Sequence, residues 1–163
     1  MYTFSRAAIV ICAWMLFTST SAVASDRSDA LTTIEQLVAA WNKGDDQDVV
    51  DRTTKAPAII DEFPPYHWEG PTALADWNRD YQAHAKEIGG VTEPRVDLLQ
   101  PAEVDVHGDT AYAVIPTTYR YISNAKRIRE GGILTAALRK IGGTWRVAAF
   151  AWSNQKVAVP RTR

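Results

Sequence analysis

The chain is poor in cysteine: its 163 residues include one, Cys12, which lies in the apolar amino-terminal stretch. The rest of the chain therefore cannot form a disulfide and must be stabilised by packing. An excess of charge of either sign is also missing, because the formal net charge is −1. A nearly neutral protein does not attract polyanions over a distance, so we expect no nucleic acid partner.

An apolar run long enough to cross a bilayer is missing as well. Residues 7–17 are almost wholly apolar but fall short of the roughly 20 residues that a membrane-spanning helix needs. They follow Arg6 and precede small residues that end in Ala22-Val23-Ala24, a pattern typical of a secretory signal peptide. We therefore expect a signal peptide over residues 1–24, and a periplasmic or secreted protein without membrane contact after cleavage. The alternative is a retained membrane anchor.

What remains has the composition of one globular domain, residues 25–163, with 46% hydrophobic and 23% charged residues in the full chain. Apolar residues at three/four spacing and capping residues predict three helices in its first part. They are one from Ser28 to Asn42-Lys43-Gly44, a short one from Asp45-Asp46, and one from Pro71 to about Ile88 that Gly89-Gly90 caps. A strand over residues 58–63 is expected before the third helix.

From Val91 onward the chain has the character of β structure. Strands are predicted over residues 95–99, 103–106, 110–122, 128–141 and 144–153. Gly108-Asp109 and Gly142-Gly143 are hairpin signals, so an antiparallel meander is the simplest pairing, and Pro101 and Pro116 should each mark a bulge or an edge. Helices first and strands later indicate an α+β fold, in which three amino-terminal helices pack on a strongly bent, mostly antiparallel sheet.

Several strands are apolar on both faces, most clearly residues 145–152. A face that met only water would carry polar side chains at alternate positions. We therefore expect a second copy of the chain to cover the outer face of the sheet and form a homodimer.

Four segments follow one another in an order typical of a known superfamily. They are VAAWNKGD at 38–45, the strand before EGPTAL at 69–74, the hairpin HGDTA at 107–111, and GTWRV at 143–147. Together they resemble the nuclear-transport-factor-2-like (NTF2-like) superfamily, and more narrowly its SnoaL-like and ketosteroid-isomerase-like members, over about residues 31–153. The resemblance implies a cone-shaped roll that closes around an apolar pocket.

The resemblance also nominates a catalytic residue. In steroid-isomerase-like members a carboxylate at the end of the first strand is the general base, and Asp61 stands at that place here. The places of the two oxyanion donors hold Leu37 and approximately Thr135 or Ala136, so these donors are not carried over. Asp61 and Glu62 would face opposite ways on a strand, and a register shift of one residue would exchange them.

His67 is the second catalytic candidate, because it is the imidazole on the stretch expected to line the pocket mouth, where it could relay protons. His84 and His107 are expected to face solvent. The three histidines show no ligand spacing with one another or with a carboxylate, so we predict no metal site and no organic cofactor.

Aromatic side chains from both halves of the chain are expected around the pocket. The ligand-binding candidates are Trp41, Tyr66, Trp68, Trp77, Tyr81, Tyr119 and Trp152, with Tyr121 in the same aromatic set. Such a lining suits a small apolar or ring-shaped molecule. Three functions stay open: a cofactor-independent lyase or isomerase with a carboxylate base, a non-catalytic ligand-binding module, and a dimeric interaction module.

Overall fold

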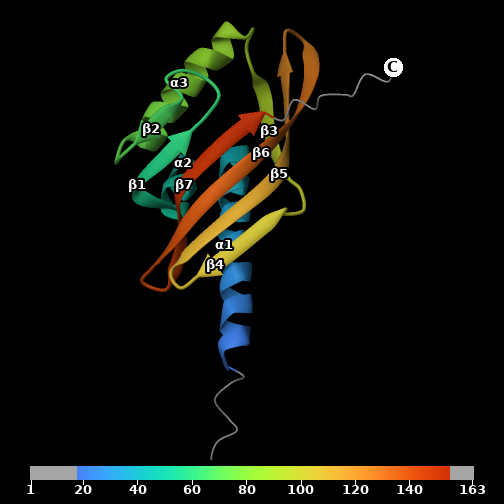
Figure 1. Ribbon diagram of the computed structural model, residues 1–163. Helices are drawn as coiled ribbons and strands as arrows, with labels where there is room; N and C mark the ends of the chain where they lie inside the picture. Colours follow the sequence, from blue (N-terminus) through green and yellow to red (C-terminus); the bar gives the residue numbers. More distant parts are fainter. Residues whose placement is uncertain (1–17, 155–163) are drawn as a thin grey trace, which may run out of the picture.

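The computed structural model describes residues 18–154 as three helices packed on a curved sheet of seven strands (Figure 1). The helices are α1 (Thr18–Lys43), α2 (Asp46–Arg52) and α3 (Ala73–Glu87). The strands are β1 (Thr53–Ile60), β2 (His67–Glu69), β3 (Thr92–Leu98), β4 (Glu103–His107), β5 (Thr110–Ser123), β6 (Lys126–Ile141) and β7 (Thr144–Asn154). The predicted α+β class and the three helices are confirmed.

The strand order in the sheet is β2-β1-β7-β6-β5-β3, and β4 also pairs with β5. All neighbours are antiparallel except β1 and β7, which run parallel and join the two ends of the chain. The expected meander is confirmed for β5, β6 and β7. It is wrong for β3 and β4, which do not pair with each other but lie one after the other along β5.

Proline explains that interruption. Pro101 stands in the connection between β3 and β4, and Pro116 stands on β5 opposite the same gap, between the partners of the two strands. Neither residue has a backbone N–H to donate to a ladder. The carbonyl of Pro116 is still used, because it accepts the Leu99 N–H at 2.9 Å. Pro116 thus stands where the pairing on one side of β5 is interrupted, while Pro101 lies in a connection rather than in a strand.

The first strand begins and ends earlier than predicted. β1 runs from Thr53 to Ile60, so Asp61 and Phe63 lie in the loop that follows it. Its pairing with β7 shifts register between Thr53 and Ala58, where the sequence has Pro57. This proline interrupts the ladder without ending the strand, since its carbonyl accepts the Gly70 N–H at 3.1 Å.

The first helix buries the predicted stripe, which includes Ile34 and Leu37 at 0% and 1% exposure. It starts well before Ser28, so the expected cap there is wrong. Its end is as predicted: Gly44 has a φ of 69°, and the Asp45 side chain then caps α2 by accepting the Asp48 N–H at 3.1 Å. A glycine suits that turn because its positive φ carries no steric penalty.

The predicted signal peptide falls mostly outside the described residues, and its last seven residues, 18–24, form the start of α1. Contacts between α1 and the sheet begin just after the expected cleavage point. Asp26 pairs with Lys140 of β6, and Arg27 donates to the Val104 carbonyl of β4. Within residues 18–154, no helix is both long and apolar enough to cross a membrane. Cleavage after Ala24 stays a prediction.

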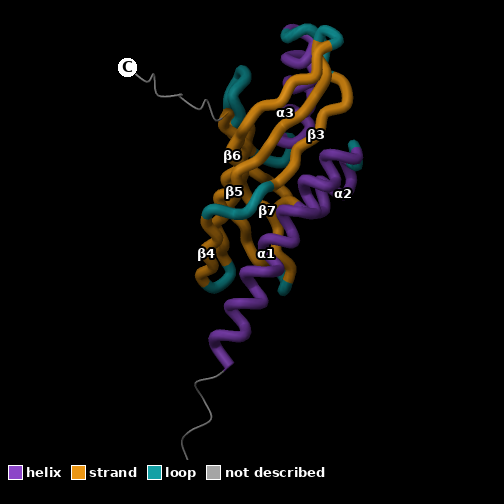
Figure 2. Tube along the Cα trace, turned by 90° about the vertical axis from the view of Figure 1, so that its right-hand side faces the viewer, coloured by secondary structure: helices purple, strands orange, loops and turns teal. Residues whose placement is uncertain are grey.

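The third helix bridges two separated parts of the sheet. Near its middle, Asp80 accepts the indole N–H of Trp68 from β2 at 2.9 Å. At its end, Gly89 and Gly90 have positive φ and form the predicted cap, and Ser123 of β5 donates to the Ile88 carbonyl at 3.0 Å. These hydrogen bonds tie α3 to the sheet at both places. In Figure 2, α1 and α2 lie along one side of the sheet.

Candidate functional site

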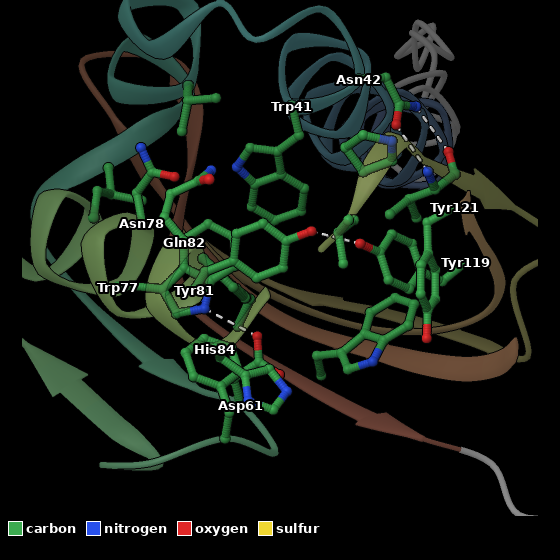
Figure 3. A pocket seen from close by; sticks show the side chains of 18 of the residues that line it. Trp41, Asn42, Asp61, Trp77, Asn78, Tyr81, Gln82, His84, Tyr119 and Tyr121 are labelled. Atoms are coloured by element: carbon green, nitrogen blue, oxygen red, sulfur yellow. Dashed lines mark hydrogen bonds between the residues drawn. The ribbon is translucent and has the colours of Figure 1, made fainter. Parts of the chain in front are cut away.

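A cavity of about 930 Å³ lies between α3, the end of α1 and the concave face of the sheet. Pockets for small molecules typically have volumes of roughly 300–1,000 Å³. This cavity can therefore hold a drug-sized molecule with up to several rings. The residues around it come from every helix and from β3, β5, β6 and β7 (Figure 3). The polar or titratable members used below are Trp41, Asp61, Trp77, Asn78, Tyr81, Gln82, His84, Tyr119, Tyr121 and Glu130.

Asp61 is the buried carboxylate of this cavity, with 9% of its surface exposed. It is held in place on both oxygens: Oδ2 accepts the Trp77 indole N–H at 2.9 Å, and Oδ1 accepts the Glu62 backbone N–H at 2.8 Å. Burial raises the pKa of Asp61 above its ordinary value of 3.8, and this effect outweighs the two hydrogen bonds, which lower it. A buried carboxylate of this kind is a better proton acceptor than one in water.

Glu62, the neighbour that a register shift would have exchanged with Asp61, lies at the exposed rim. Its Oε2 accepts the Asn154 backbone N–H at 3.1 Å. The loop after β1 thus turns one carboxylate inward and uses the other to hold the end of β7. The open choice between the two is decided in favour of Asp61 as the buried group.

His84 is the imidazole in the cavity wall, and His67 is not. The His84 ring stacks on Phe63 with 5.2 Å between centroids and an interplanar angle of 9°, and Figure 3 shows it beside Asp61. Its charge, when present, lowers the pKa of Asp61. His67 projects from β2 with 55% of its side chain exposed and lies 3.9 Å from Glu69. The expectation that His84 faces solvent is therefore wrong.

Two tyrosine hydroxyls meet inside the cavity. Tyr81 of α3 and Tyr119 of β5 lie 2.5 Å apart, oxygen to oxygen (Figure 3). Burial raises the pKa of both phenols, so both stay protonated at neutral pH. In such a pair one hydrogen is shared between the hydroxyls and the other remains for a ligand oxygen.

A third tyrosine, Tyr121, extends this group along β5. Its ring stacks on Tyr119 at 4.9 Å, and its hydroxyl donates to Glu130 Oε1 at 3.0 Å. Burial, followed by that hydrogen bond, raises the pKa of Tyr121 to about 12. The carboxylate thereby fixes one end of the tyrosine row on the sheet side of the cavity.

The rest of the wall is aromatic and tightly packed. The Trp41 ring contacts Phe150 at 5.0 Å and Trp77 at 6.0 Å, and Trp77 stacks on Tyr81 at 5.8 Å. Rings arranged in this way present flat faces to a ligand and hold one another in place. The lining therefore favours a flat, largely apolar molecule.

The predicted aromatic set divides into two groups. Six of its members lie in the cavity wall: Trp41, Trp77, Tyr81, Tyr119, Tyr121 and Trp152. Tyr66 and Trp68 lie outside it, which corrects the expectation for both. Tyr66 is 56% exposed at the tip of its loop, and Trp68 is 5% exposed behind Phe63, where its N–H is used by Asp80.

The places of the missing oxyanion donors hold apolar core. Leu37 and Ala136 are 1% and 2% exposed, whereas the Tyr81–Tyr119 pair supplies hydroxyls from two other elements. Spacing could have indicated His84, since it continues the stripe of Trp77 and Tyr81 along α3. Within residues 18–154, no group of three or more His, Cys, Asp or Glu side chains is arranged to hold a metal ion.

Comparison with known proteins identifies the fold. No family model and no curated protein matches the chain. Among solved structures, an NTF2-like protein with a cystatin-like fold from Novosphingobium aromaticivorans is 14% identical, with a TM-score of 0.69 over 90% of this chain and 95% of that one. An NTF2-like superfamily protein from Salmonella enterica serovar Typhimurium is 19% identical, with a TM-score of 0.67 over 89% and 100%.

A ketosteroid isomerase-like protein from Erwinia carotovora atroseptica is 17% identical, with a TM-score of 0.63 over 79% of this chain and 95% of that one. The chain therefore has the NTF2-like, cystatin-like cone fold, as the resemblance in the sequence implied. This fold carries many functions, so the activity has to be argued from the site.

Proposed function

We propose that the cavity binds a small, flat, largely apolar ketone and that Asp61 moves a proton on it, without a metal ion or an organic cofactor. The observation that supports this most is a 9% exposed carboxylate in an aromatic cavity, whose burial raises its pKa. A general base with a pKa closer to neutrality is better matched to removing a proton from carbon. The protein would thus be an isomerase or a lyase.

The proposed chemistry uses three groups. The Asp61 carboxylate takes the proton from the carbon next to the carbonyl, and the electron pair of the broken C–H bond moves into the carbonyl to give an enolate. The Tyr81–Tyr119 hydroxyls donate a hydrogen bond to the enolate oxygen. An isomerase then returns the proton to another carbon of the same molecule. A lyase instead expels a leaving group, which His84 can protonate.

The first test uses 2-tetralone, a flat two-ring ketone whose protons next to the carbonyl exchange with D₂O and are followed by NMR. The protein should accelerate this exchange, and Asp61→Asn should slow the catalysed rate by about 10²–10⁴-fold, because the amide cannot accept the proton. The amide oxygen can still accept the Trp77 N–H, while the hydrogen bond from the Glu62 backbone N–H is lost, so retention of the fold is checked by circular dichroism.

Glu62→Gln is the matched control. It removes a neighbouring carboxylate that is exposed at the rim, so its catalysed exchange rate should stay close to that of the wild type. Equal rates in the wild type and in Asp61→Asn would exclude Asp61 as the base.

A non-catalytic binding module is the second candidate, and one observation favours it. Both oxygens of Asp61 already accept hydrogen bonds from the protein, as they would if the residue only fastened the loop to α3. In that case 2-tetralone should quench tryptophan fluorescence equally in the wild type and in Asp61→Asn, with no catalysed exchange in either. Catalysed exchange that depends on Asp61 would exclude this candidate.

A further inference from the structure

The cavity wall carries more negative than positive charge. Its Asp, Glu, Arg and His side chains are Asp46, Asp61, Glu62, Glu130, Arg79, Arg95 and His84. Arg79 forms ion pairs with Asp76 and Asp80, and Arg95 pairs with Asp97. Because these three aspartates lie outside the wall, the charges of both arginines are already compensated. A histidine adds positive charge only when it is protonated.

The buried carboxylates of the wall have no such partners. Asp61 accepts hydrogen bonds from an indole and a backbone N–H, and Glu130 accepts one from the Tyr121 hydroxyl. These donors are uncharged, and within residues 18–154 neither carboxylate forms an ion pair. The amides in the wall, Asn78 and Gln82, are uncharged as well. The cavity therefore holds negative charge without a counter-ion from the described part of the chain.

Much of the remaining wall consists of aromatic rings whose planes surround the cavity from different directions. Trp41 and Phe150 meet at 63°, and Tyr119 and Trp152 at 76°. Trp41, Tyr119 and Trp152 are only partly buried, so part of each side chain stays open to a ligand. The face of an aromatic ring is negative and attracts a cation within about 6 Å of its centre, most strongly for tryptophan.

We infer that the cavity binds a flat organic cation, whose positive charge is spread over an aromatic ring system, in preference to a neutral molecule of the same shape. The ring faces favour a cation, and so do the charges of Asp61 and Glu130, which act through space without direct contact. A delocalised charge, like that of a guanidinium group, is more weakly hydrated than a compact ammonium group and loses less on leaving water. The inference rests on the proposed function for its cavity, to which it adds the charge of the ligand.

The test compares two probes that each have two fused six-membered rings and one methyl group. They are the cation 1-methylquinolinium and 4-methylquinoline, which is uncharged in mildly alkaline solution. Wild-type protein should bind the cation about 10–100-fold more tightly, because the ring faces and the carboxylates act together. The dissociation constants are measured by titration calorimetry.

NMR spectra of the wild type show where the cation binds without the need for a variant. The ¹⁵N–¹H signals of the Trp77 and Trp152 indoles, which line the cavity, should shift on titration with 1-methylquinolinium. The indole of Trp145 lies outside the cavity wall, so its signal is the internal control and should stay in place. A shift at Trp145 alone would mean that the cation binds elsewhere, and would overturn the inference.

Glu130→Gln removes one charge from the wall, while its amide oxygen can still accept the Tyr121 hydroxyl. The affinity ratio of cation to neutral probe should fall about three- to tenfold, through weaker binding of the cation. Glu35→Gln is the matched control, since it removes the same charge from an exposed position of α1 outside the wall and should leave the ratio unchanged. Circular dichroism checks the fold of both variants, and the wild-type measurements do not depend on them.

Equal affinities for the two probes in the wild type, or tighter binding of 4-methylquinoline, overturn the inference, as does a ratio that Glu130→Gln leaves unchanged. Failure of the proposed function has a different signature: the exchange of 2-tetralone is not catalysed, while the affinity ratio can still be read. Catalysed exchange together with an affinity ratio of one overturns the inference alone. Absence of binding of either probe at millimolar concentration also overturns it.

Discussion

Asp61 is the residue on which the proposed function depends most. Its surroundings have opposing effects on its pKa. Removal from water favours the neutral acid, while the Trp77 N–H, the Glu62 backbone N–H and a charged His84 favour the carboxylate. Glu62 adds a smaller repulsion that again favours the neutral acid. Burial is the largest of these effects, so the folded protein holds a proton on Asp61 to higher pH than the unfolded chain does.

The raised pKa of Asp61 in the folded state predicts how the stability of the protein depends on pH. A carboxylic acid whose pKa is raised by folding stabilises the folded state most at low pH, below 3.8, and this contribution is lost as pH rises through the folded-state pKa. Asp61→Asn does not titrate there. The free energy of unfolding of Asp61→Asn, relative to the wild type, should therefore increase as the pH is raised through that window.

Urea denaturation of both proteins at a series of pH values measures this difference. The catalysed exchange rate should rise over the same window, because the base acts when ionised. A relative stability that does not change with pH would show that the pKa of Asp61 is not raised.

The histidines show a limit of predicting site residues from the local sequence. The sequence favours His67, because it lies in an aromatic stretch that is expected to line the pocket mouth. The short strand β2 turns that stretch back along β1, and alternation then points Trp68 inward and His67 outward. His84 reaches Asp61 only because α3 passes across the end of β1. Proximity in sequence was thus a poorer guide than proximity across elements.

Among the elements, β6 and β7 form part of the cavity wall. There the large Trp152 side chain of β7 packs over Gly132 of β6, which has no side chain. Leu134 of β6 lies opposite Trp152 of β7, and Gly132 comes two residues earlier on the same face of β6. The Trp152 ring lies over Gly132 so closely that a Cβ added there would be 2.4 Å from Cζ2. The absence of a side chain at Gly132 therefore positions an indole in the cavity.

Gly132→Ala should destabilise the protein by about 1–3 kcal/mol, because the rigid indole has to move. The measurement is the free energy of unfolding in urea. The matched background is Trp152→Ala, in which the same glycine substitution should have a much smaller effect because the clash is gone. An equal effect in both backgrounds would mean that Trp152 does not depend on Gly132.

For the whole molecule, the outer face of the sheet is notable because its centre is mostly apolar. Across four strands its central row is Ile60, Ala151, Thr135 and Val114, which lie side by side in register. Exposed Ile60 and Tyr112 lie on this face, at 54% and 42%. Such a row is unusual for a sheet surface that faces water.

Arginines gather at one end of this face, while the other end carries two carboxylates together with Arg139 of β6. Arg95, Arg120 and Arg129 are register neighbours on β3, β5 and β6, whereas Glu103 and Asp105 lie on β4. Like charges directly opposite one another destabilise a sheet, and Asp97 contacts two of the three arginines. A second copy related by a twofold axis that runs across the line joining the two ends would place the carboxylates of one protomer against the arginines of the other.

We therefore propose a homodimer through this face. Light scattering at micromolar concentration should give the mass of a dimer for the wild type and of a monomer for Ala151→Lys, which places a charge at the centre of the face. Ala83→Lys, on an exposed position of α3, is the control and should stay dimeric. A monomeric wild type would contradict the proposal.

The residue pattern was enough to predict the class of the fold, the three helices and most strands, and it limited the buried carboxylate to Asp61 or Glu62. These features depend on local properties: the three/four spacing in α1, the Gly44 and Asp45 cap, the hairpin glycines, and a charged pair directly after an apolar strand. Each can be recognised within a few residues of chain.

The composition of the site depended instead on contacts between distant segments. The parallel pairing of β1 with β7 and the crossing of α3 over the sheet decide that Asp61, His84 and the Tyr81–Tyr119 pair share one cavity. They also decide that His67 and Tyr66 lie outside it, and that the Trp41 N–H is buried without a partner in the described part of the chain. Registers and crossings are set by packing of the whole core, so no local pattern contains them.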